Sequence, residues 1–462
     1  MVDMTAREIT EAVGGVLTGN GDTVIKDIQY DSRAVKEGTL FVAIKGENVD
    51  GHKFISDCFA KGAAAVFTEN EVPEDAAGCY IKVENSRTAL QRLSAHYRSR
   101  QNIRLIGITG SVGKTSTKEM IAAGLSKGFD VMKTQGNKNS QIGLPMTMFD
   151  IAAHNEVAVI EMGMSEFGEM DRLADIARPS MAVMTNIGVA HIENLGTQEN
   201  ILKEKFRITK YFDKDSVLFL NGDDKLLKTL HNKQSFKTIT FGLFSDDDYY
   251  AEDIKAVGFN TRFVCCYDGK KTVIEIPALG EHSVRNALAA FAVGKHLGLD
   301  EKVIQDGLMT YKNAPMRQQI HEMKDFLVID DSYNSSPDAA KVSLNVLKSV
   351  AKGKSVAVLA DMLELGEKAE SEHYGVGKHL AEIGIDTLLT IGELSENTAK
   401  GAKENGCKNV VSFDNNADAY KYLSNIIEKD CAVLVKGSRG MHTDEIVKKV
   451  LADFEQKNDK EI

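Results

Sequence analysis

Short runs of apolar residues recur along this chain and alternate with segments that have a helical spacing of apolar positions. Runs of four to six aliphatic residues are typical of buried strands, and apolar residues three and four apart are typical of one helix face. Between residues 101 and 314 the alternation predicts a mainly parallel sheet with crossover helices. Its strands are predicted at 103–108, 130–133, 157–160 and 181–184.

A glycine-rich turn separates the strand at 103–108 from a helix predicted at 116–125. Glycines let backbone N–H groups close around a phosphate, and a helix N-terminus adds partial positive charge. Ile108 stands where the strict phosphate-loop pattern has glycine, so the turn fits the variant T-G-x-x-G-K-T. We expect nucleotide binding, with the Lys114 ammonium on the phosphates and the Thr115 hydroxyl on Mg²⁺. The predicted ATP contacts of the turn are Thr109, Gly110, Ser111, Val112, Gly113, Lys114, Thr115 and Ser116.

Similar patterns flank this central unit. Near the N-terminus, Thr5 and Glu8 have the spacing of a capping box that opens a helix. Near the C-terminus, a helix is predicted to begin with Ser336 as its cap and Pro337 at its first position. The expected fold class is α/β with three domains. These are a small α/β N-terminal domain (1–100), a central P-loop mononucleotide-binding domain (101–314) and a C-terminal Rossmann-like domain (315–462).

The composition limits the classes of binding partner and the cellular compartment that we expect for this protein. The net charge of −11 argues against non-specific binding to nucleic acid or to an anionic membrane. Six cysteines without metal-ligand spacing are predicted to be buried, reduced thiols. The N-terminus does not resemble a signal peptide, and no apolar run approaches 18 residues. We expect a cytoplasmic protein.

Several polar residues follow predicted strands, where ligands of open α/β sheets bind. Glu161 comes directly after the strand at 157–160, and a carboxylate there suits Mg²⁺, although such a residue is more often a helix cap. His191 follows the strand at 181–184, where a lone histidine often has a structural role. Lys203 and Lys205 have the spacing of a solvated helix face.

Two polar clusters lie in the first hundred residues, at 31–33 and 45–54. Such clusters are about equally well explained as turn and cap residues. Together they supply arginine, lysine, histidine and hydroxyl groups that suit an anionic ligand.

Nine motifs in order over all three units resemble the Mur ligases, which are ATP-dependent amide ligases of peptidoglycan synthesis. They are ITGSVGKTSTKEM, GNKNSQIGLP, EMGM, TNIGVAHIENLG, LNGDD, NALAA, DDSYNSSPDAA, DMLELGE and VKGSRGMHTDEIV. The last two are most similar to the family members that add D-alanyl-D-alanine to UDP-N-acetylmuramoyl-tripeptide. The resemblance implies these two small-molecule substrates and an acyl-phosphate intermediate. We expect a monomer, the default for a three-domain ligase that opens and closes, and, from the charge and hydropathy, no membrane or nucleic-acid partner. Whether the tripeptide ends in meso-diaminopimelate or L-lysine stays open.

The resemblance also assigns roles to residues. It implies ATP, two Mg²⁺ ions and CO₂, the last as a carbamate on Lys205. Thr115 and Glu161 would hold the first Mg²⁺, and His191 and carbamylated Lys205 the second. An unmodified lysine ammonium would repel the metal, whereas a carbamate offers oxygen donors. Asn286 matches a residue near the adenine, and Arg317 and Asp331 match contacts to the phosphate and ribose. The first-domain residues that match the UDP-sugar region are Ser32, Arg33, Lys45, Gly46 and His52. Asn137 and Asn139 are further expected substrate contacts.

The chain departs from the family pattern at two places, with Ser283 after His282 and with Ala360 before Asp361. The first puts an amide contact in doubt, and the second indicates a packing difference. The alternatives are a neighbouring Mur ligase that adds the third residue, a folylpolyglutamate synthetase and a non-catalytic nucleotide-binding scaffold. The Asp-Asn-Pro-Arg motif of diaminopimelate-adding members is not found. Intact Lys114, Glu161, His191 and Lys205 argue against the scaffold.

Overall fold

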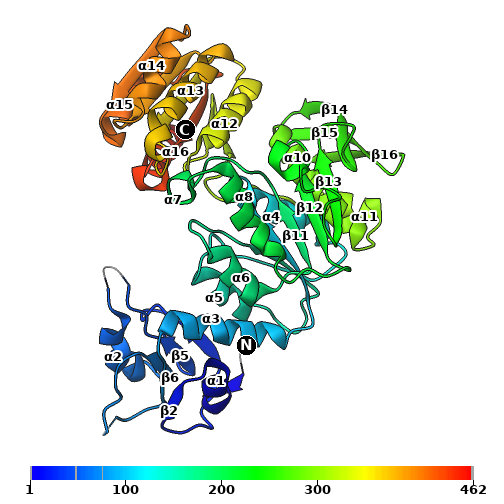
Figure 1. The fold of residues 1–462 in the computed structure, drawn as a ribbon. Coiled ribbons are helices and arrows are strands. Elements are labelled where there is room, and N and C mark those ends of the chain that lie inside the picture. Colours follow the sequence, from blue (N-terminus) through cyan, green and yellow to red (C-terminus); the bar gives the residue numbers. More distant parts are fainter. Residues whose placement is uncertain (1–2, 47–48, 75, 459–462) are drawn as a thin grey trace.

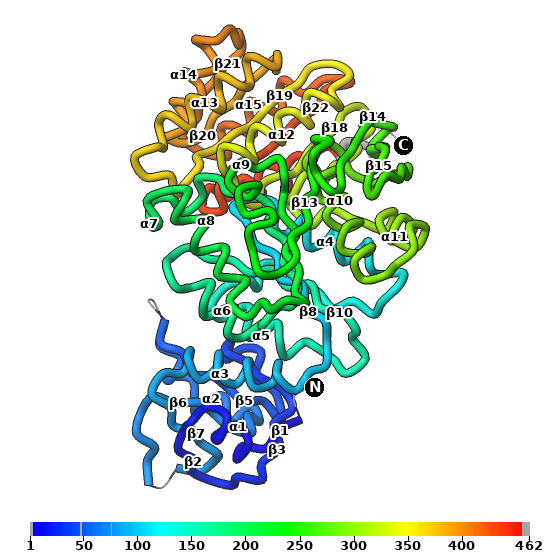
Figure 2. The backbone as a smooth tube through the Cα atoms, turned by 45° about the vertical axis from the view of Figure 1, so that its right-hand side comes forward, coloured from blue at the N-terminus to red at the C-terminus, as the bar shows by residue number. Residues whose placement is uncertain are grey.

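Three α/β domains follow one another along the molecule (Figure 1). The structure is a computed structural model that describes residues 3–46, 49–74 and 76–458. The N-terminal domain lies at one end, the C-terminal domain at the other, and the turned view shows the same order (Figure 2). The expected α/β class is confirmed. The boundaries at residues 100 and 314 stay predictions.

The N-terminal domain has a five-stranded sheet in the order β2-β7-β6-β5-β4 and a two-stranded sheet of β1 and β3. The predicted capping box is present, because the Thr5 hydroxyl accepts the Glu8 N–H and the Glu8 carboxylate accepts the Thr5 N–H. Helix α3 also contacts α5 and α6 of the central domain. The elements are β1 (Met4–Thr5), α1 (Ala6–Val13), β2 (Val16–Thr18), β3 (Val24–Ile25), β4 (Asp27–Gln29), β5 (Thr39–Val42), η1 (Gly51–Phe54), α2 (Ile55–Ala60), β6 (Ala63–Thr68), β7 (Tyr80–Lys82) and α3 (Ser86–Ser99).

The central domain is built on a nine-stranded sheet in the order β16-β15-β14-β13-β12-β11-β8-β10-β9. Neighbours from β9 to β14 pair in parallel, as predicted, and β15 and β16 extend the sheet antiparallel. The strands are β8 (Arg104–Thr109), β9 (Val131–Lys133), β10 (Val157–Glu161), β11 (Met181–Met184), β12 (Val217–Asn221), β13 (Lys237–Gly242), β14 (Tyr249–Val257), β15 (Asn260–Tyr267) and β16 (Lys270–Ile276).

Helices cover both faces of the central sheet, so its middle strands are buried on both sides. On one face α4 packs against α10 and α11. Helix α4 begins at Lys114, two residues before the predicted start, because the glycine turn leads directly into its first turn. The helices are α4 (Lys114–Leu125), α5 (Gly143–Phe149), α6 (Glu169–Ala177), α7 (Ile192–Leu195), α8 (Gln198–Phe206), η2 (Arg207–Thr209), α9 (Lys225–Lys228), α10 (Glu281–His296) and α11 (Glu301–Leu308).

The C-terminal domain has a six-stranded sheet in the order β17-β18-β22-β19-β20-β21, parallel except for β17. Helix α12 begins at Pro337 as predicted, but the Ser336 side chain makes no capping hydrogen bond to the described residues. The elements are β17 (Gln319–Glu322), β18 (Leu327–Asp330), α12 (Pro337–Val350), β19 (Ser355–Ala360), η3 (Gly366–Lys368), α13 (Ala369–Glu382), β20 (Thr387–Ile391), α14 (Glu396–Glu404), β21 (Asn409–Phe413), α15 (Asn416–Ile426), β22 (Ala432–Lys436), η4 (Arg439–Met441) and α16 (Asp444–Asn458).

The order of the central strands determines where a site forms. Strand β8 pairs with β10 on one side and with β11 on the other. Because all three are parallel, their carboxyl ends meet at one edge of the sheet. The loops after these strands therefore come together there. Among the described residues, no helix has the length and apolar character needed to cross a bilayer.

Candidate active site

The glycine-rich turn after β8 is held against the end of β11. The Ser111 and Val112 N–H groups donate to the backbone and side-chain oxygens of Asn186, over 3.0 and 2.8 Å. The Thr185 hydroxyl donates to the Val112 carbonyl over 2.6 Å. Gly110 has a φ of +153°, and a Cβ there would lie 1.9 Å from Thr185 Oγ1. Glycine is therefore required at this position, both for its conformation and for its lack of a side chain.

Lys114 lies at the start of α4 with its Nζ on the loop itself, 2.8 Å from the Gly110 carbonyl and 3.3 Å from that of Ser111. Burial lowers the pKa of Lys114, and the nearby Glu161 carboxylate opposes this effect. A bound phosphate chain would supply the negative charge that such a half-buried ammonium requires.

Glu161 ends β10 with a buried carboxylate that two side chains orient. Its Oε2 accepts a hydrogen bond from the Thr115 hydroxyl over 2.9 Å, and its Oε1 accepts one from the Asn139 amide over 2.7 Å. The carboxylate therefore faces the first turn of α4, beside the phosphate loop. Asn139 and Asn137 come from the loop that follows β9.

His191 lies after β11 in a left-handed conformation, with a φ of +63°, at the start of α7. Burial lowers its pKa to about 4, and the charges of Lys205 and Lys114 add to this effect. The imidazole is therefore neutral near pH 7. Its Nδ1 lies 3.2 Å from the Glu364 carboxylate, which belongs to the C-terminal domain.

Lys205 differs from the solvated residue that its spacing predicted. It is completely buried, whereas Lys203, two positions earlier on α8, is exposed. Its Nζ donates to the Gly110 carbonyl over 3.1 Å, so Lys205 supports the phosphate loop from α8. Burial, together with the Lys114 charge, holds the pKa of Lys205 well below its usual range. The reading as a surface lysine was wrong because residue spacing does not show which turn of α8 faces the loop.

Helix α10 closes another side of the site. The Asn286 amide oxygen accepts a hydrogen bond from Thr117 of α4 over 2.8 Å. Arg285 pairs with Asp223, which follows β12. Ser283 donates to the carbonyl of Leu279, which precedes α10, over 2.8 Å.

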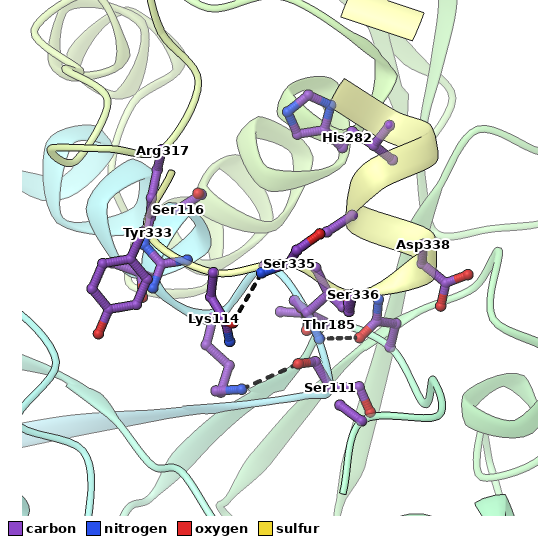
Figure 3. A pocket seen from close by; sticks show the side chains of 18 of the residues that line it. Ser111, Lys114, Ser116, Thr185, His282, Arg317, Tyr333, Ser335, Ser336 and Asp338 are labelled. Atoms are coloured by element: carbon purple, nitrogen blue, oxygen red, sulfur yellow. Dashed lines mark hydrogen bonds between the residues drawn. The ribbon is translucent and has the colours of Figure 1, made fainter. Parts of the chain in front are cut away.

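The C-terminal domain supplies the facing wall. Asp331 accepts hydrogen bonds from Lys436 over 2.6 Å and from the Gln318 N–H over 3.1 Å. The guanidinium of Arg317 stacks over the Tyr333 ring, 4.2 Å from its centre. The Tyr333 ring thus holds Arg317 in place at the site (Figure 3).

These groups surround one cavity of about 850 Å³ between the central and C-terminal domains. Figure 3 shows Ser111, Lys114 and Thr185 on one side, with Tyr333 and Ser335 facing them. Of the predicted site residues, Ser111, Val112, Gly113, Lys114, Thr115, Ser116, Asn137, Asn139, Glu161, His191, Asn286, Arg317 and Asp331 line it.

Other predicted site residues lie outside this cavity lining. Thr109, Gly110 and Lys205 are buried and do not line it. The N-terminal residues Ser32, Arg33, Lys45, Gly46 and His52 belong to a different domain.

Two separate ion pairs involve those N-terminal residues. Arg33 pairs with Asp31 over 2.7 Å, and His52 Nδ1 lies 2.7 Å from Asp50. Lys45 and Asp50 form an isolated β-bridge, and residues 47 and 48 between them lie outside the described residues. The polar groups of this loop and of the turn at 31–33 thus both belong to the N-terminal domain.

Sequence reasoning missed several residues that line the cavity. Lys436 ends β22, more than a hundred residues after its partner Asp331. Tyr333 and Ser335 lie in a quoted motif but received no role. Their position after a strand of the C-terminal domain was the available signal, because ligands of parallel sheets bind there.

The side chains beside the phosphate loop can be compared with the ligands that Mg²⁺ prefers. Thr115 and Glu161 offer hard oxygen donors next to a phosphate site, and neutral His191 offers a ring nitrogen. Among the described residues, no group of three or more His, Cys, Asp and Glu side chains is placed to hold a metal ion. Mg²⁺ commonly takes one or two protein ligands and completes its shell with phosphate and water. The residues therefore fit Mg²⁺ bound together with a nucleotide.

Comparison with known protein families agrees with this geometry. The model of the Mur ligase middle domain matches residues 108–294, and that of the Mur ligase glutamate ligase domain matches 316–439. The model of the Mur ligase family catalytic domain matches residues 24–98. The chain belongs to the Mur ligase family. The resemblance inferred from the motifs is thus confirmed.

Individual Mur ligases match this chain over nearly its whole length. It is 37% identical to the UDP-N-acetylmuramoyl-tripeptide--D-alanyl-D-alanine ligase of Bacillus subtilis (strain 168), over 98% of this chain and 99% of that one. A crystal structure of MurF from Acinetobacter baumannii aligns with a TM-score of 0.91 and 29% identity, over 97% and 99% of the two chains. MurF ligase from Thermotoga maritima in complex with ADP aligns with a TM-score of 0.84 and 28% identity, over 94% and 98%.

Proposed function

We propose that this Mur ligase joins D-alanyl-D-alanine to UDP-N-acetylmuramoyl-tripeptide and converts ATP to ADP and phosphate. One observation carries the proposal: the phosphate loop, Glu161, Arg317 and Asp331 line a single cavity between two domains. Such a site holds a nucleotide next to a second substrate. The Bacillus subtilis relative, which aligns over almost the entire chain, is named for this reaction.

The reaction is carboxylate activation followed by amide formation. A terminal carboxylate oxygen of the tripeptide attacks the γ-phosphorus of ATP, the bond from that phosphorus to the bridging oxygen breaks, and ADP leaves. The amine of D-alanyl-D-alanine then attacks the acyl carbon of the resulting acyl phosphate. The tetrahedral intermediate expels phosphate with the electron pair of the carbon–oxygen bond, and the amine loses a proton.

Both steps develop negative charge on oxygen, so the protein contributes mainly positioning and fixed positive groups. The N–H groups of the phosphate loop and the first turn of α4 face the phosphates. Lys114 supplies a cation on one side, and Arg317 supplies another from the C-terminal domain. With both domains around the cavity, bulk water is kept from the acyl phosphate, which water would hydrolyse.

We propose that two Mg²⁺ ions bind with the nucleotide. Thr115 and Glu161 would hold the first, and His191 and a carbamate on Lys205 the second. When bound, Mg²⁺ neutralises charge on the phosphate oxygens and orients them. Asn139 supports this arrangement because its amide holds one oxygen of the Glu161 carboxylate.

The proposed carbamate on Lys205 is supported by burial. A carbamate forms when the nitrogen of a neutral amine bonds to the carbon of CO₂ and releases a proton. Lys205 is completely buried beside the Gly110 carbonyl, which disfavours its ammonium form. A ¹³C NMR spectrum of the protein under ¹³CO₂ tests this directly, since Lys205→Ala removes the carbamate carbon signal if the modification is on this residue.

Binding of the UDP-sugar is proposed for the N-terminal domain. The turn at Ser32 and Arg33 and the loop with Lys45, Gly46 and His52 supply its polar groups. Asn137 and Asn139 would contact the peptide end, because they line the cavity near Glu161.

We further propose that the enzyme is a cytoplasmic monomer. One chain supplies both walls of the cavity. The six cysteines all lie within the described residues and are buried, free thiols, as predicted, which fits a reducing compartment.

Phosphate release from ATP tests the function. UDP-N-acetylmuramoyl-tripeptide is supplied with and without D-alanyl-D-alanine, and the product is weighed by mass spectrometry. Release that requires both, with a product heavier by the dipeptide less water, is expected. Activity with single amino acids on the dipeptide precursor would instead identify a neighbouring Mur ligase, and tight ATP binding without turnover would identify a scaffold.

A further inference from the structure

Lys118 lies on α4, four residues after Lys114, and has no exposed surface. Fully buried lysines are rare unless their charge is paired. Its Nζ donates to the Thr134 carbonyl over 2.7 Å and lies 3.0 Å from Glu119 Oε1. The other oxygen of Glu119 contacts Lys133, so one carboxylate faces two ammonium groups.

Thr134 follows β9 and is fully buried, and its three polar groups are all in use. Its N–H donates to the Val159 carbonyl of β10 over 3.1 Å. Its hydroxyl accepts the Glu161 N–H over 2.9 Å, and its carbonyl accepts Lys118. A chain of hydrogen bonds therefore runs from the middle of α4 to the residue that ends β10.

Thr134 also fixes the start of the loop that carries Asn139, the second residue that orients the Glu161 carboxylate. The loop that begins after Thr134 carries Asn139, whose amide donates to Glu161 Oε1. The Asn139 carbonyl accepts the Gly163 N–H over 2.9 Å, which ties this loop to the segment after β10. A shift of Thr134 would move both the backbone of Glu161 and the residue that orients its side chain.

We propose that Lys118 is a positioning residue for the metal-binding carboxylate. By holding Thr134, it orients Glu161 toward the Thr115 hydroxyl, where the proposed function places Mg²⁺. A charged donor in a buried site makes a strong hydrogen bond, which suits it to fix a backbone carbonyl. The inference rests on the proposed metal site, and it adds a residue that does not line the cavity.

The test measures binding of the β,γ-methylene analogue of ATP by calorimetry, with Mg²⁺ and with EDTA. Wild-type protein is expected to bind the analogue more tightly with Mg²⁺. In Lys118→Met, affinity in EDTA stays within about twofold of wild type, while the tightening by Mg²⁺ falls about tenfold. The matched control is Lys133→Met, which removes the other lysine from Glu119 and leaves the contact to Thr134 intact; it keeps the full tightening.

Two results would overturn the inference. One is full Mg²⁺ tightening in Lys118→Met, and the other is an equal loss of affinity with and without Mg²⁺, which a merely structural role predicts. If Lys118→Met does not fold, Thr134→Val is measured instead, because it removes the hydroxyl that accepts the Glu161 N–H. Unchanged Mg²⁺ tightening in Thr134→Val would also overturn the inference. Thr134→Ser keeps a hydroxyl and should keep the tightening. Absence of tightening in the wild type would instead contradict the proposed Mg²⁺ site itself.

Discussion

Single side chains in the site show how burial and charge set their chemistry. Lys114 and Lys205 both contact the Gly110 carbonyl, Lys114 from the start of α4 and Lys205 from α8. Burial lowers the pKa of each, and each charge lowers the pKa of His191. The motifs name these residues, but their shared contact is visible only in the fold.

We expect Lys114→Ala to abolish most ligation. Removing one donor that stabilises developing oxyanion charge typically costs about 10²–10³-fold in kcat. Steady-state phosphate release measures the loss. Lys203→Ala, on the exposed side of α8, serves as the control and keeps normal turnover. Near-wild-type turnover in Lys114→Ala would contradict the assignment of the loop.

Asp247 is a buried carboxylate outside the candidate site, and the sequence analysis gave it no role. Its side chain is completely buried, and neither carboxylate oxygen has a hydrogen-bond partner among the described residues. Lys228 lies 3.9 Å away, and a Cβ on Gly222 would lie 1.7 Å from Asp247 Oδ1. Burial raises its pKa to about 6. Sequence reasoning could not find it, because the acidic run at 246–248 resembles a solvated turn.

This raised pKa predicts how stability depends on pH. The folded state holds the Asp247 proton more tightly than the unfolded state, so stability falls as pH rises from about 4 to about 6. Asp247→Asn should therefore raise the free energy of unfolding above pH 6, by up to about 3 kcal/mol. Urea unfolding at pH 4.5 and 7.5 measures this. Asp246→Asn, at an exposed neighbour, should give no such rise, and equal stability of Asp247→Asn and wild type at pH 7.5 would refute the prediction.

At the scale of elements, the regular parts of the sheets were predictable. Strands β8, β9, β10 and β11 occur where the apolar runs indicated. The strands between residues 217 and 276 were not predicted. Strands β12 and β13 are almost wholly buried, so their apolar runs were an available signal that was not used. In β15, Phe263, Cys265 and Tyr267 lie on one buried face, so an alternating pattern was available there as well.

Helix packing gives a prediction within one element. Gly375 and Gly377 both lie on α13, but a Cβ on Gly375 would meet open space, whereas one on Gly377 would lie 1.9 Å from the Thr398 carbonyl of α14. Gly375→Ala should stabilise the protein by about 0.5–1 kcal/mol, because alanine loses less backbone entropy. Gly377→Ala should destabilise it by about 1–3 kcal/mol through overpacking. Thermal unfolding of the pair compares them, and equal effects would contradict the close approach of α13 and α14.

At the scale of the molecule, the cavity exists because two domains meet. Gly188 after β11 donates its N–H to Ser111, and a Cβ there would lie 2.9 Å from the Asp338 carboxylate of α12. His191 contacts Glu364 across the same junction. Small changes at this junction should therefore affect closure more than folding.

We expect Gly188→Leu to lower kcat about tenfold or more, because its side chain would enter the space used by Asp338 and disfavour the closed arrangement. Kinetics and small-angle scattering measure turnover and compactness. Asp338→Ala in the same background should recover part of the turnover. A Gly188→Leu protein with normal turnover would show that the junction tolerates the side chain.

The sequence by itself determined the α/β class, the phosphate loop and the family, because these depend on local periodicity and on motifs of adjacent residues. Together with the resemblance it also named 13 residues that line the cavity. Only the tertiary structure decided that Lys205 is buried, that Asp331 pairs with Lys436 and that Lys118 reaches Thr134. These contacts join residues 16 to more than 100 positions apart. Burial and pairing at such separations follow from how the sheets and helices pack, which no local pattern records.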